Sequence, residues 1–368
     1  MKKIAFFVLI TLTGVLTLCC CACSGNEENK VSEARLEVSS LDVNADFTAQ
    51  TVTVTVTSDS DWGVSIEGAP EWVSVFPGGG VSGTSEITFT FTENKGLEPR
   101  SAKVLYRAGS TRKAGTVTQG FDENSDIVVP EGYRLVWQEE FDSGDCPDTD
   151  KWWYETGGGG WGNNEVQTYV SQTTPSGTNI AKVEKGALTI SVVKENGVYY
   201  SIRVNTKEAW QYGWFEARLK VSDDPGSWPA FWMMPKNFTT WPGDGEIDIM
   251  EYAISTQGKN KSSSSVHCNA YNWPKGTQKT HVQSVSNAAT EFHVYALEWT
   301  ADQMVFYIDG KSHLTFRNNG GGYDTWPFNA PFYLKLNMAY GGNMGGTRDD
   351  NALPAEYQID YVRVFQKK

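Results

Sequence analysis

Apolar and polar residues alternate with a period of two through much of this chain. In the first third, the alternation is clearest at 51–57, which reads Thr-Val-Thr-Val-Thr-Val-Thr, and at 86–92. Successive side chains of a strand point to opposite faces, so both segments are predicted to be half-buried β-strands. Turn-forming residues separate the strands, for example Pro-Gly-Gly-Gly at 77–80. We therefore expect a small immunoglobulin-like antiparallel β-sandwich at residues 34–120.

The alternation resumes after a polar, acidic linker that we place at residues 121–130. Strands are predicted at 187–193 and 215–221, and 292–308 reads as two strands of a meander. The sequence contains no convincing amphipathic helix of ordinary length. Residues 131–368 are thus predicted to form one all-β domain, whose length a single domain allows.

The first 22 residues have the pattern of an export signal. Two lysines precede an apolar run at 4–18, which is too short to span a bilayer comfortably. The Ala-Cys pair ending at Cys23 resembles the end of a bacterial lipobox, so Cys23 is the expected lipidation site, with Cys19–Cys21 as less favoured alternatives. Residues 23–33 would form a polar tether. The sequence predicts an exported lipoprotein, anchored by lipid in the outer membrane at the cell surface.

Composition narrows the class of partner. The formal net charge is −13, which argues against nucleic acid and against direct binding to an anionic membrane surface. Aromatic residues make up 13% of the chain, including 14 Trp, and indole rings stack well on sugar rings. A neutral polysaccharide is the expected partner of what we take to be a monomer. Cys146 and Cys268 could pair, but a chain with a large core does not need the bridge.

Three carboxylates stand close together in Gly245–Tyr252, which reads Gly-Glu-Ile-Asp-Ile-Met-Glu-Tyr. On a strand, Glu246 and Asp248 face one way and the isoleucines face the core. Strict alternation would bury Glu251, but one extra residue around Met250, accommodated as a β-bulge, returns it to the face of Glu246. The segment therefore predicts three acids in a row on one open face.

Such a row suits glycoside hydrolysis. Close carboxylates repel, which raises the pKa of at least one of them. A retaining glycosidase needs one ionised carboxylate and one protonated carboxylic acid, about 5–5.5 Å apart. The alternatives are a solvated acidic strand face with ion-pair partners elsewhere, or a calcium site.

The octapeptide resembles the signature of glycoside hydrolase family sixteen, in the bulged form of the laminarinase-like branch. Further segments that resemble this family occur in order at 135–141, 157–167, 212–218, 228–232 and 360–365. The resemblance implies a C-terminal β-jelly-roll sandwich with an open concave cleft. It also implies a retaining endo-β-glucanase that acts on β-1,3- or mixed-linkage β-1,3/1,4-glucan and needs no organic cofactor. Another polysaccharide (agarose, porphyran or carrageenan) and a non-catalytic glycan-binding lipoprotein are the alternatives.

By position in the motif, Glu246 resembles the family's nucleophile and Glu251 its general acid/base, with Asp248 between them. The resemblance further implies a set of cleft residues: Trp161, Asn163, Asn164, Glu165, Arg203, Trp228, Trp232 and His267. For Trp228 and His267 the alternative is core packing, and for Arg203 it is a structural ion pair. A structural calcium ion on the convex face would use Glu140, the Gly186 carbonyl and Asp360.

The N-terminal segment resembles the BACON module of exported carbohydrate-active lipoproteins. The residues that carry this resemblance are Trp62, Trp72, Asn94, Arg100 and 117–120. The module holds no carboxylate pair of the kind found at 245–252. We interpret it as a spacer, with glycan binding as the alternative.

Overall fold

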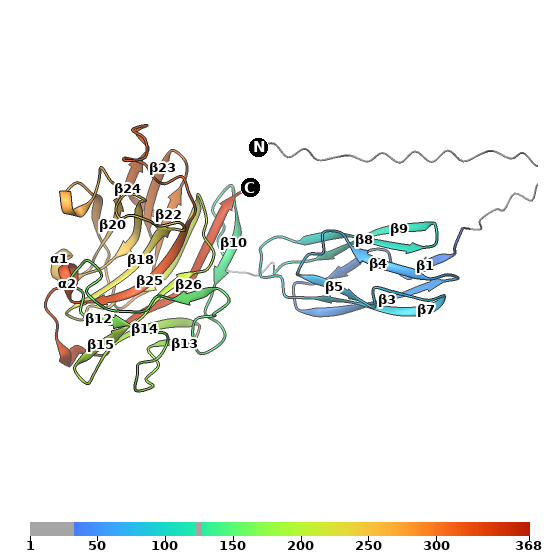
Figure 1. Ribbon diagram of the computed structural model, residues 1–368, viewed down its shortest axis with the longest axis horizontal. Coiled ribbons are helices and arrows are strands. Elements are labelled where there is room, and N and C mark those ends of the chain that lie inside the picture. The colour runs from blue at the N-terminus through green and yellow to red at the C-terminus, as the bar shows by residue number, and fades with distance from the viewer. Residues whose placement is uncertain (1–32, 123–126) are drawn as a thin grey trace, which may run out of the picture. The chain divides into compact units, whose positions relative to one another are not determined.

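The computed structural model describes residues 33–122 and 127–368 and divides them into two compact units (Figure 1). The smaller unit, here called the N-terminal module, ends at Gly120, and the larger one, the C-terminal domain, runs from Phe121 to Lys368 and also takes in Lys95–Glu98. The export signal, Cys23 and nearly all of the tether lie outside the described residues. Within the described ranges, no helix is long and apolar enough to cross a membrane.

Two sheets surround one core in the N-terminal module. The four-stranded sheet has the order β1-β3-β7-β5, and the five-stranded sheet has the order β2-β9-β8-β4-β6. The strands are β1 (Leu36–Val38), β2 (Val43–Ala45), β3 (Gln50–Ser58), β4 (Trp62–Ile66), β5 (Val73–Phe76), β6 (Gly79–Gly80), β7 (Gly83–Phe91), β8 (Arg100–Ala108) and β9 (Thr111–Gln119). The predicted alternating segments at 51–57 and 86–92 fall on β3 and β7, which pair with each other.

The indoles of this module pack inward. Trp62 is 6% exposed, and Trp72 is partly buried with the Arg100 guanidinium 4.9 Å from its ring centre. Phe76, by contrast, is 80% exposed. Buried indoles are consistent with a spacer, although that role stays a prediction.

The C-terminal domain is a sandwich of two large sheets, as the sequence predicted. Its main sheet follows the order β12-β15-β14-β26-β17-β22-β23-β24, with β10 paired to β26 and β13 to β14. The strands of this sheet are β10 (Tyr133–Glu139), β12 (Gln167–Tyr169), β13 (Ala181–Glu184), β14 (Ala187–Glu195), β15 (Val198–Ser201), β17 (Gly213–Lys220), β22 (His293–Trp299), β23 (Gln303–Ile308), β24 (Lys311–Arg317) and β26 (Ala355–Lys367). The predicted strands at 187–193, 215–221 and 292–308 are confirmed by β14, β17 and the β22–β23 pair.

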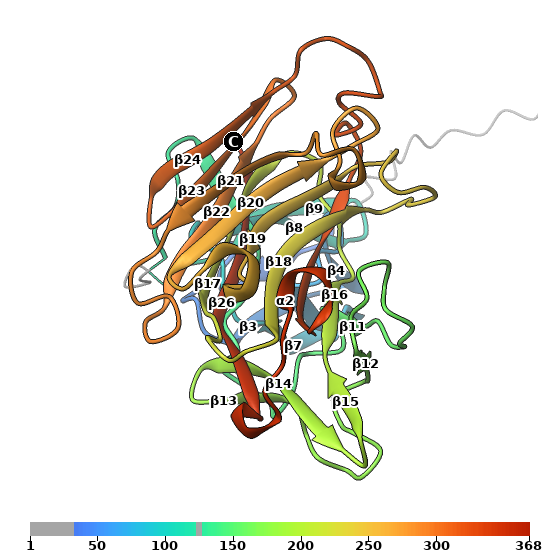
Figure 2. The ribbon, with the colours of Figure 1, turned by 90° about the vertical axis from the view of Figure 1, so that its left-hand side faces the viewer.

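A seven-stranded sheet forms the other layer and carries the site. Its order is β11-β16-β25-β18-β19-β20-β21, and Figure 2 shows β18, β19 and β20 side by side. These strands are β11 (Trp152–Tyr154), β16 (Arg203–Thr206), β25 (Phe332–Tyr340), β18 (Ser227–Pro235), β19 (Glu246–Glu251), β20 (Lys261–His267) and β21 (Lys279–Ser284). Only short helices interrupt the described part of the domain: α1 (Ile254–Gln257), α2 (Gly342–Gly345) and the 3₁₀ turns Trp273–Lys275 and Asp350–Ala352.

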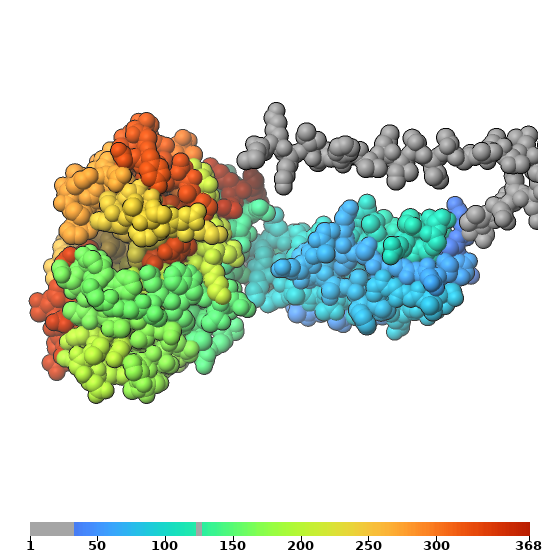
Figure 3. Space-filling view, viewed as in Figure 1, coloured from blue at the N-terminus to red at the C-terminus, as the bar shows by residue number. Residues whose placement is uncertain are grey.

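The space between the sheets is filled by one apolar core. Phe215 and Leu297 from one sheet and Phe231 and Leu336 from the other are fully buried in it. Cys146 and Cys268 are both unpaired. The core side of the seven-stranded sheet is closed in this way. On its opposite side the domain is hollowed in the space-filling view (Figure 3).

Candidate active site

The acidic strand β19 contains the predicted β-bulge. Asp248 pairs with Ser265 on β20, whereas Glu251 pairs with Ser263, so two residues of β19 lie opposite one residue of β20. The same shift occurs against β18, and Ile249 has no Cα partner on either neighbour. The bulge reverses the alternation, which leaves Ile249 buried and brings Glu251 to the face of Glu246 and Asp248.

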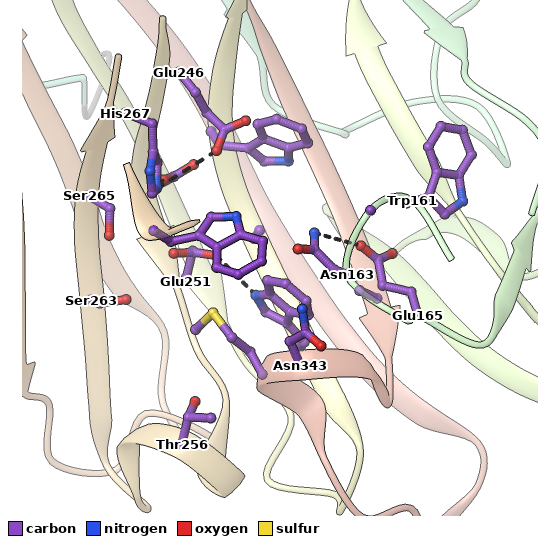
Figure 4. A pocket seen from close by; sticks show the side chains of 18 of the residues that line it. Trp161, Asn163, Glu165, Glu246, Glu251, Thr256, Ser263, Ser265, His267 and Asn343 are labelled. Carbon is purple, nitrogen blue, oxygen red and sulfur yellow. Dashed lines mark hydrogen bonds and ion pairs between the residues drawn. The ribbon is translucent and has the colours of Figure 1, made fainter. Parts of the chain in front are cut away.

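These three acids line a cleft of about 760 Å³. Figure 4 shows Glu246, Glu251 and His267 on one side of the cleft and Trp161, Asn163 and Glu165 on the opposite side. The cleft is also lined by Asn164, Arg203, Trp228, Trp232, Trp241, Asp248, Gln257, Ser263, Ser265, Trp273, Asn337, Asn343 and Met344. All eleven residues that the sequence placed in the catalytic or substrate-binding set therefore border one cavity.

Each acid has a different set of hydrogen-bonding partners. The Trp241 indole N–H donates to Glu246 Oε2 at 3.1 Å, and the Trp228 indole N–H donates to Glu251 Oε1 at 3.1 Å. His267 Nε2 lies 3.2 Å from Asp248 Oδ2 and 3.9 Å from Glu246 Oε1. The His267 imidazole therefore lies between Asp248 and Glu246, and Glu246 and Glu251 each also accept a hydrogen bond from an indole.

Burial raises the pKa of all three carboxyl groups, in each case to about 8. The charge of Asp248 raises the pKa of Glu246 and Glu251 further, whereas His267 lowers it for both. Groups this close titrate as a coupled set. At least one of the three carboxyl groups thus keeps its proton at neutral pH. General acid catalysis requires such a proton.

The glycine-rich loop after β11 forms the opposite wall. The carboxylate of Glu165, buried to 7% exposure, accepts from Gln167 Nε2 at 2.6 Å and from Asn163 Nδ2 at 3.3 Å. Asn164 Nδ2 donates to Asn343 Oδ1 at 2.9 Å, which ties the loop to α2. Trp161 lies at a left-handed φ of 49°. Hydrogen bonds to neighbouring elements therefore fix the polar side chains of the loop before any sugar binds.

Arg203 supports this wall from beneath. Its guanidinium carbon lies 4.3 Å from the centre of the Trp161 ring and 4.4 Å from that of Tyr169. Its nitrogens lie 3.8 Å from Glu155 and 3.9 Å from Glu165. Arg203 is 6% exposed and forms structural ion pairs while it also borders the cleft, so substrate contact by Arg203 stays a prediction.

The two tryptophans of β18 lie on the same face of the strand. Phe231 is fully buried in the core, so Trp228 and Trp232 on either side of it face the cleft, as alternation predicts. Trp228 is 8% exposed and is held by its hydrogen bond to Glu251. Its position favours support of the acid over broad stacking on a sugar ring.

Sequence reasoning missed several cleft residues. Trp241 is 36% exposed and reaches back from the loop before β19 to Glu246. Asn337 Oδ1 accepts from the Trp232 indole at 2.6 Å, and its amide nitrogen donates to the Tyr169 hydroxyl at 3.0 Å. A Trp-Pro pair directly before the acidic motif was a signal that could have indicated Trp241. Asn337 carries no local signal, because β25 reaches the site only through sheet pairing.

The predicted calcium site does not fit the side chains as they lie. Both carboxylate oxygens of Glu140 accept from Arg363, at 2.9 and 2.8 Å, and Asp360 pairs with Arg218 at 2.5 Å. Guanidinium groups thus already neutralise the two carboxylates expected to share a cation with the Gly186 carbonyl. These ion pairs do not support the calcium site, which stays a prediction.

Within the described ranges, one group of His, Cys, Asp and Glu side chains has the spacing of metal ligands. Glu246, Asp248 and His267 offer ligand atoms that all lie within 4.8 Å of one another. The same three side chains are explained by the acid chemistry of the cleft, which needs no metal.

An open cleft across a β-sandwich, lined by indoles and by a row of buried carboxylates on one strand, defines a glycoside hydrolase. The comparisons with known proteins agree. Residues 167–363 match the model described as glycosyl hydrolases family 16, and the chain belongs to this family. Residues 60–120 match the BACON model, described as a putative N-terminal binding domain.

Named proteins and solved structures are similar to this domain. The chain is 40% identical to the beta-glucanase of Rhodothermus marinus over 252 residues. The aligned region covers 64% of this chain and 85% of that protein. The X-ray structure of the laminarinase from Rhodothermus marinus is 38% identical, with a TM-score of 0.60 over 64% of this chain and 98% of that one. SCLam, a non-specific endo-β-1,3(4)-glucanase, is 38% identical, with a TM-score of 0.60 over 66% of this chain and 97% of that one.

Proposed function

We propose that this protein is a retaining endo-β-glucanase that hydrolyses β-1,3- or mixed-linkage β-1,3/1,4-glucan at the cell surface. The observation that carries the proposal is the placement of Glu246 and Glu251 on one face of a bulged strand, with Asp248 between them. The relatives named as laminarinase and as endo-β-1,3(4)-glucanase support the choice of β-glucan.

In the proposed cycle, Glu246 attacks the anomeric carbon while Glu251 protonates the leaving oxygen. The Trp241 N–H orients the Glu246 carboxylate, and both Trp241 and the nearby His267 lower the pKa of Glu246. We assign the proton of the coupled set to Glu251, whose pKa is raised by burial and by the charge of Asp248. Glu251 next deprotonates the water that releases the sugar from Glu246.

The charge of the cleft favours a neutral polymer. Among the described residues that line it, the one Lys or Arg is Arg203, whose charge is already balanced by Glu155 and Glu165. Sulfated polymers such as carrageenan would need cationic partners that can reach the substrate. This observation ranks β-glucan above the sulfated alternatives.

The substrate assignment is tested by measuring reducing ends released from laminarin, barley β-glucan, lichenan, agarose and carrageenan. We expect release from at least one of the three β-glucans and a broad range of early product sizes, since an open cleft admits internal bonds. The Glu251→Ala protein serves as the blank. Release confined to agarose or carrageenan would contradict the substrate assignment, and no release from any polymer by folded protein would favour a non-catalytic glycan binder.

The membrane anchor is proposed from the N-terminal sequence. We expect Cys23→Ser to move the protein from the membrane fraction to the soluble fraction without loss of activity on soluble glucan, because the lipid contributes affinity for the bilayer and does not reach the cleft. Fractionation, immunoblotting and an assay of both fractions measure this. Cys21→Ser is the matched control and should stay membrane-bound. Lipid found on Cys21 by mass spectrometry would show that Cys21, and not Cys23, is the lipidation site.

A further inference from the structure

Four consecutive serines, Ser262 to Ser265, form the centre of β20 beside the acidic strand. Ser263 and Ser265 line the cleft, and Ser262 and Ser264 alternate with them. Ser262 and Ser264 are 0% and 1% exposed. Serine is uncommon at fully buried strand positions, so their hydroxyls require partners.

Both buried hydroxyls donate to backbone carbonyls of the bulge. Ser264 Oγ lies 2.7 Å from the carbonyl oxygen of Ile249, the residue without a Cα partner on either neighbouring strand. Ser262 Oγ lies 3.0 Å from the carbonyl oxygen of Glu251 itself. The two serines thus bind the bulge at its middle and at its end.

A chain of donors reaches Ser264 from the other sheet. A hydroxyl has one proton, and Ser264 uses it on Ile249, so Ser264 Oγ must accept at its contact with His313 Nε2, 3.1 Å away. His313 therefore carries its proton on Nε2, and its Nδ1 is an acceptor. His281 Nδ1, at 3.3 Å from that atom, must be the donor.

The charge state of His313 agrees with this order. Burial lowers the pKa of His313 to about 4, and the nearby His281 lowers it further. The ring is thus neutral at neutral pH, as an acceptor at Nδ1 requires. His281 lies on β21 and His313 on β24, so the chain of hydrogen bonds runs from the edge of both sheets to the acidic strand.

We propose that Ser264, supported by His313 and His281, is a positioning residue for Glu251, and that Ser262 assists it. A strand that slips by one residue turns its side chains to the opposite face. Without the bulge, Glu251 would point into the core. The hydroxyls of Ser264 and Ser262 favour the bulged register, because in that register the carbonyl oxygens of Ile249 and Glu251 lie within hydrogen-bonding distance of them. The inference rests on the proposed function only in taking Glu251 as the general acid/base.

The kinetic test is Ser264→Ala. We expect kcat on laminarin to fall at least about tenfold while KM changes less than about twofold, because a displaced acid weakens bond cleavage more than binding. A 2,4-dinitrophenyl β-laminaribioside has a leaving group that needs no protonation. Its burst rate, which reports formation of the glycosyl-enzyme, should therefore fall less than about twofold. His313→Ala should give the same pattern with a smaller loss.

Ser201→Ala is the matched control. Its hydroxyl is also fully buried and donates to a backbone carbonyl, that of Met338, at 2.6 Å. We expect kcat within about twofold of the parent, since one such hydrogen bond contributes little to net stability. Equal losses in Ser264→Ala and Ser201→Ala would show a general packing effect and overturn the proposal. An unchanged kcat in Ser264→Ala, or an equal loss on both substrates, would do the same.

A second measurement needs no substrate. Amide hydrogen exchange at Met250 and Glu251 should be at least about tenfold faster in Ser264→Ala and in His313→Ala than in Ser201→Ala, because the bulge loses its anchor. Unchanged exchange at these amides would overturn the proposal. If the parent protein proved inactive on every β-glucan, the proposed function would fail, while this exchange measurement would still decide whether the serine and histidine chain holds the bulge. His313→Ala serves both measurements should Ser264→Ala fail to fold.

Discussion

Glu246→Ala and Glu251→Ala are each expected to lower kcat on laminarin by at least about 10⁴-fold. The first removes the attacking oxygen and the second the proton donor. Neither change should unfold the protein, because both side chains border the cleft and their loss removes buried like charges. Reducing-sugar release, with circular dichroism as the check on folding, measures the effect.

Azide separates the two roles. With an activated substrate, azide should react in Glu246→Ala at the open anomeric face and give a glycosyl azide of inverted configuration. In Glu251→Ala it should attack the glycosyl-enzyme on Glu246 and give the retained product. If the two products were exchanged, the assignment of nucleophile and acid/base would be reversed.

Asp248→Asn is expected to move the whole pH profile of kcat/KM to lower pH, by about one unit. The charge of Asp248 raises the pKa of both Glu246 and Glu251. Removing it lowers both, so Glu246 ionises at lower pH on the acid limb and Glu251 loses its proton at lower pH on the alkaline limb. Activity at pH 8 should therefore fall more than activity at pH 5. Initial rates across this range measure the shift.

The control for this change is Asp309→Asn. Asp309 also pairs with a histidine, His293, at 2.8 Å, but it lies at the other sheet, in the turn between β23 and β24. Its profile should match that of the parent. If the pH profile of kcat/KM in Asp248→Asn stayed in place or moved to higher pH, Asp248 would not set the protonation of Glu246 and Glu251.

Local patterns were sufficient to predict the fold and the acidic strand. Alternation is visible in residue type, so β3, β7, β14 and β17 could be located directly. The bulge followed from chemistry, since three acids on one strand serve a purpose only if they share a face. Pairing order between distant strands leaves no such trace, and the jelly roll itself came from the family resemblance.

The rest of the site depends on contacts that residue type does not specify. Asn337 and His313 reach β18 and β20 from strands more than 40 residues away, so no local window contains both partners. The calcium prediction had the same weakness: the sequence contains the carboxylates but does not show which arginines face them. The contacts of Arg203 with Trp161 and Glu165 likewise could not be predicted from residue type.

The central claim is that Glu246 and Glu251 carry out a double displacement on β-glucan. Proton NMR of laminarin hydrolysis in the first minutes, before mutarotation, tests it most directly. The account predicts that new reducing ends form first as the β-anomer and only later equilibrate with the α-anomer. Initial formation of the α-anomer would show inversion and contradict the assignment of Glu246 as nucleophile.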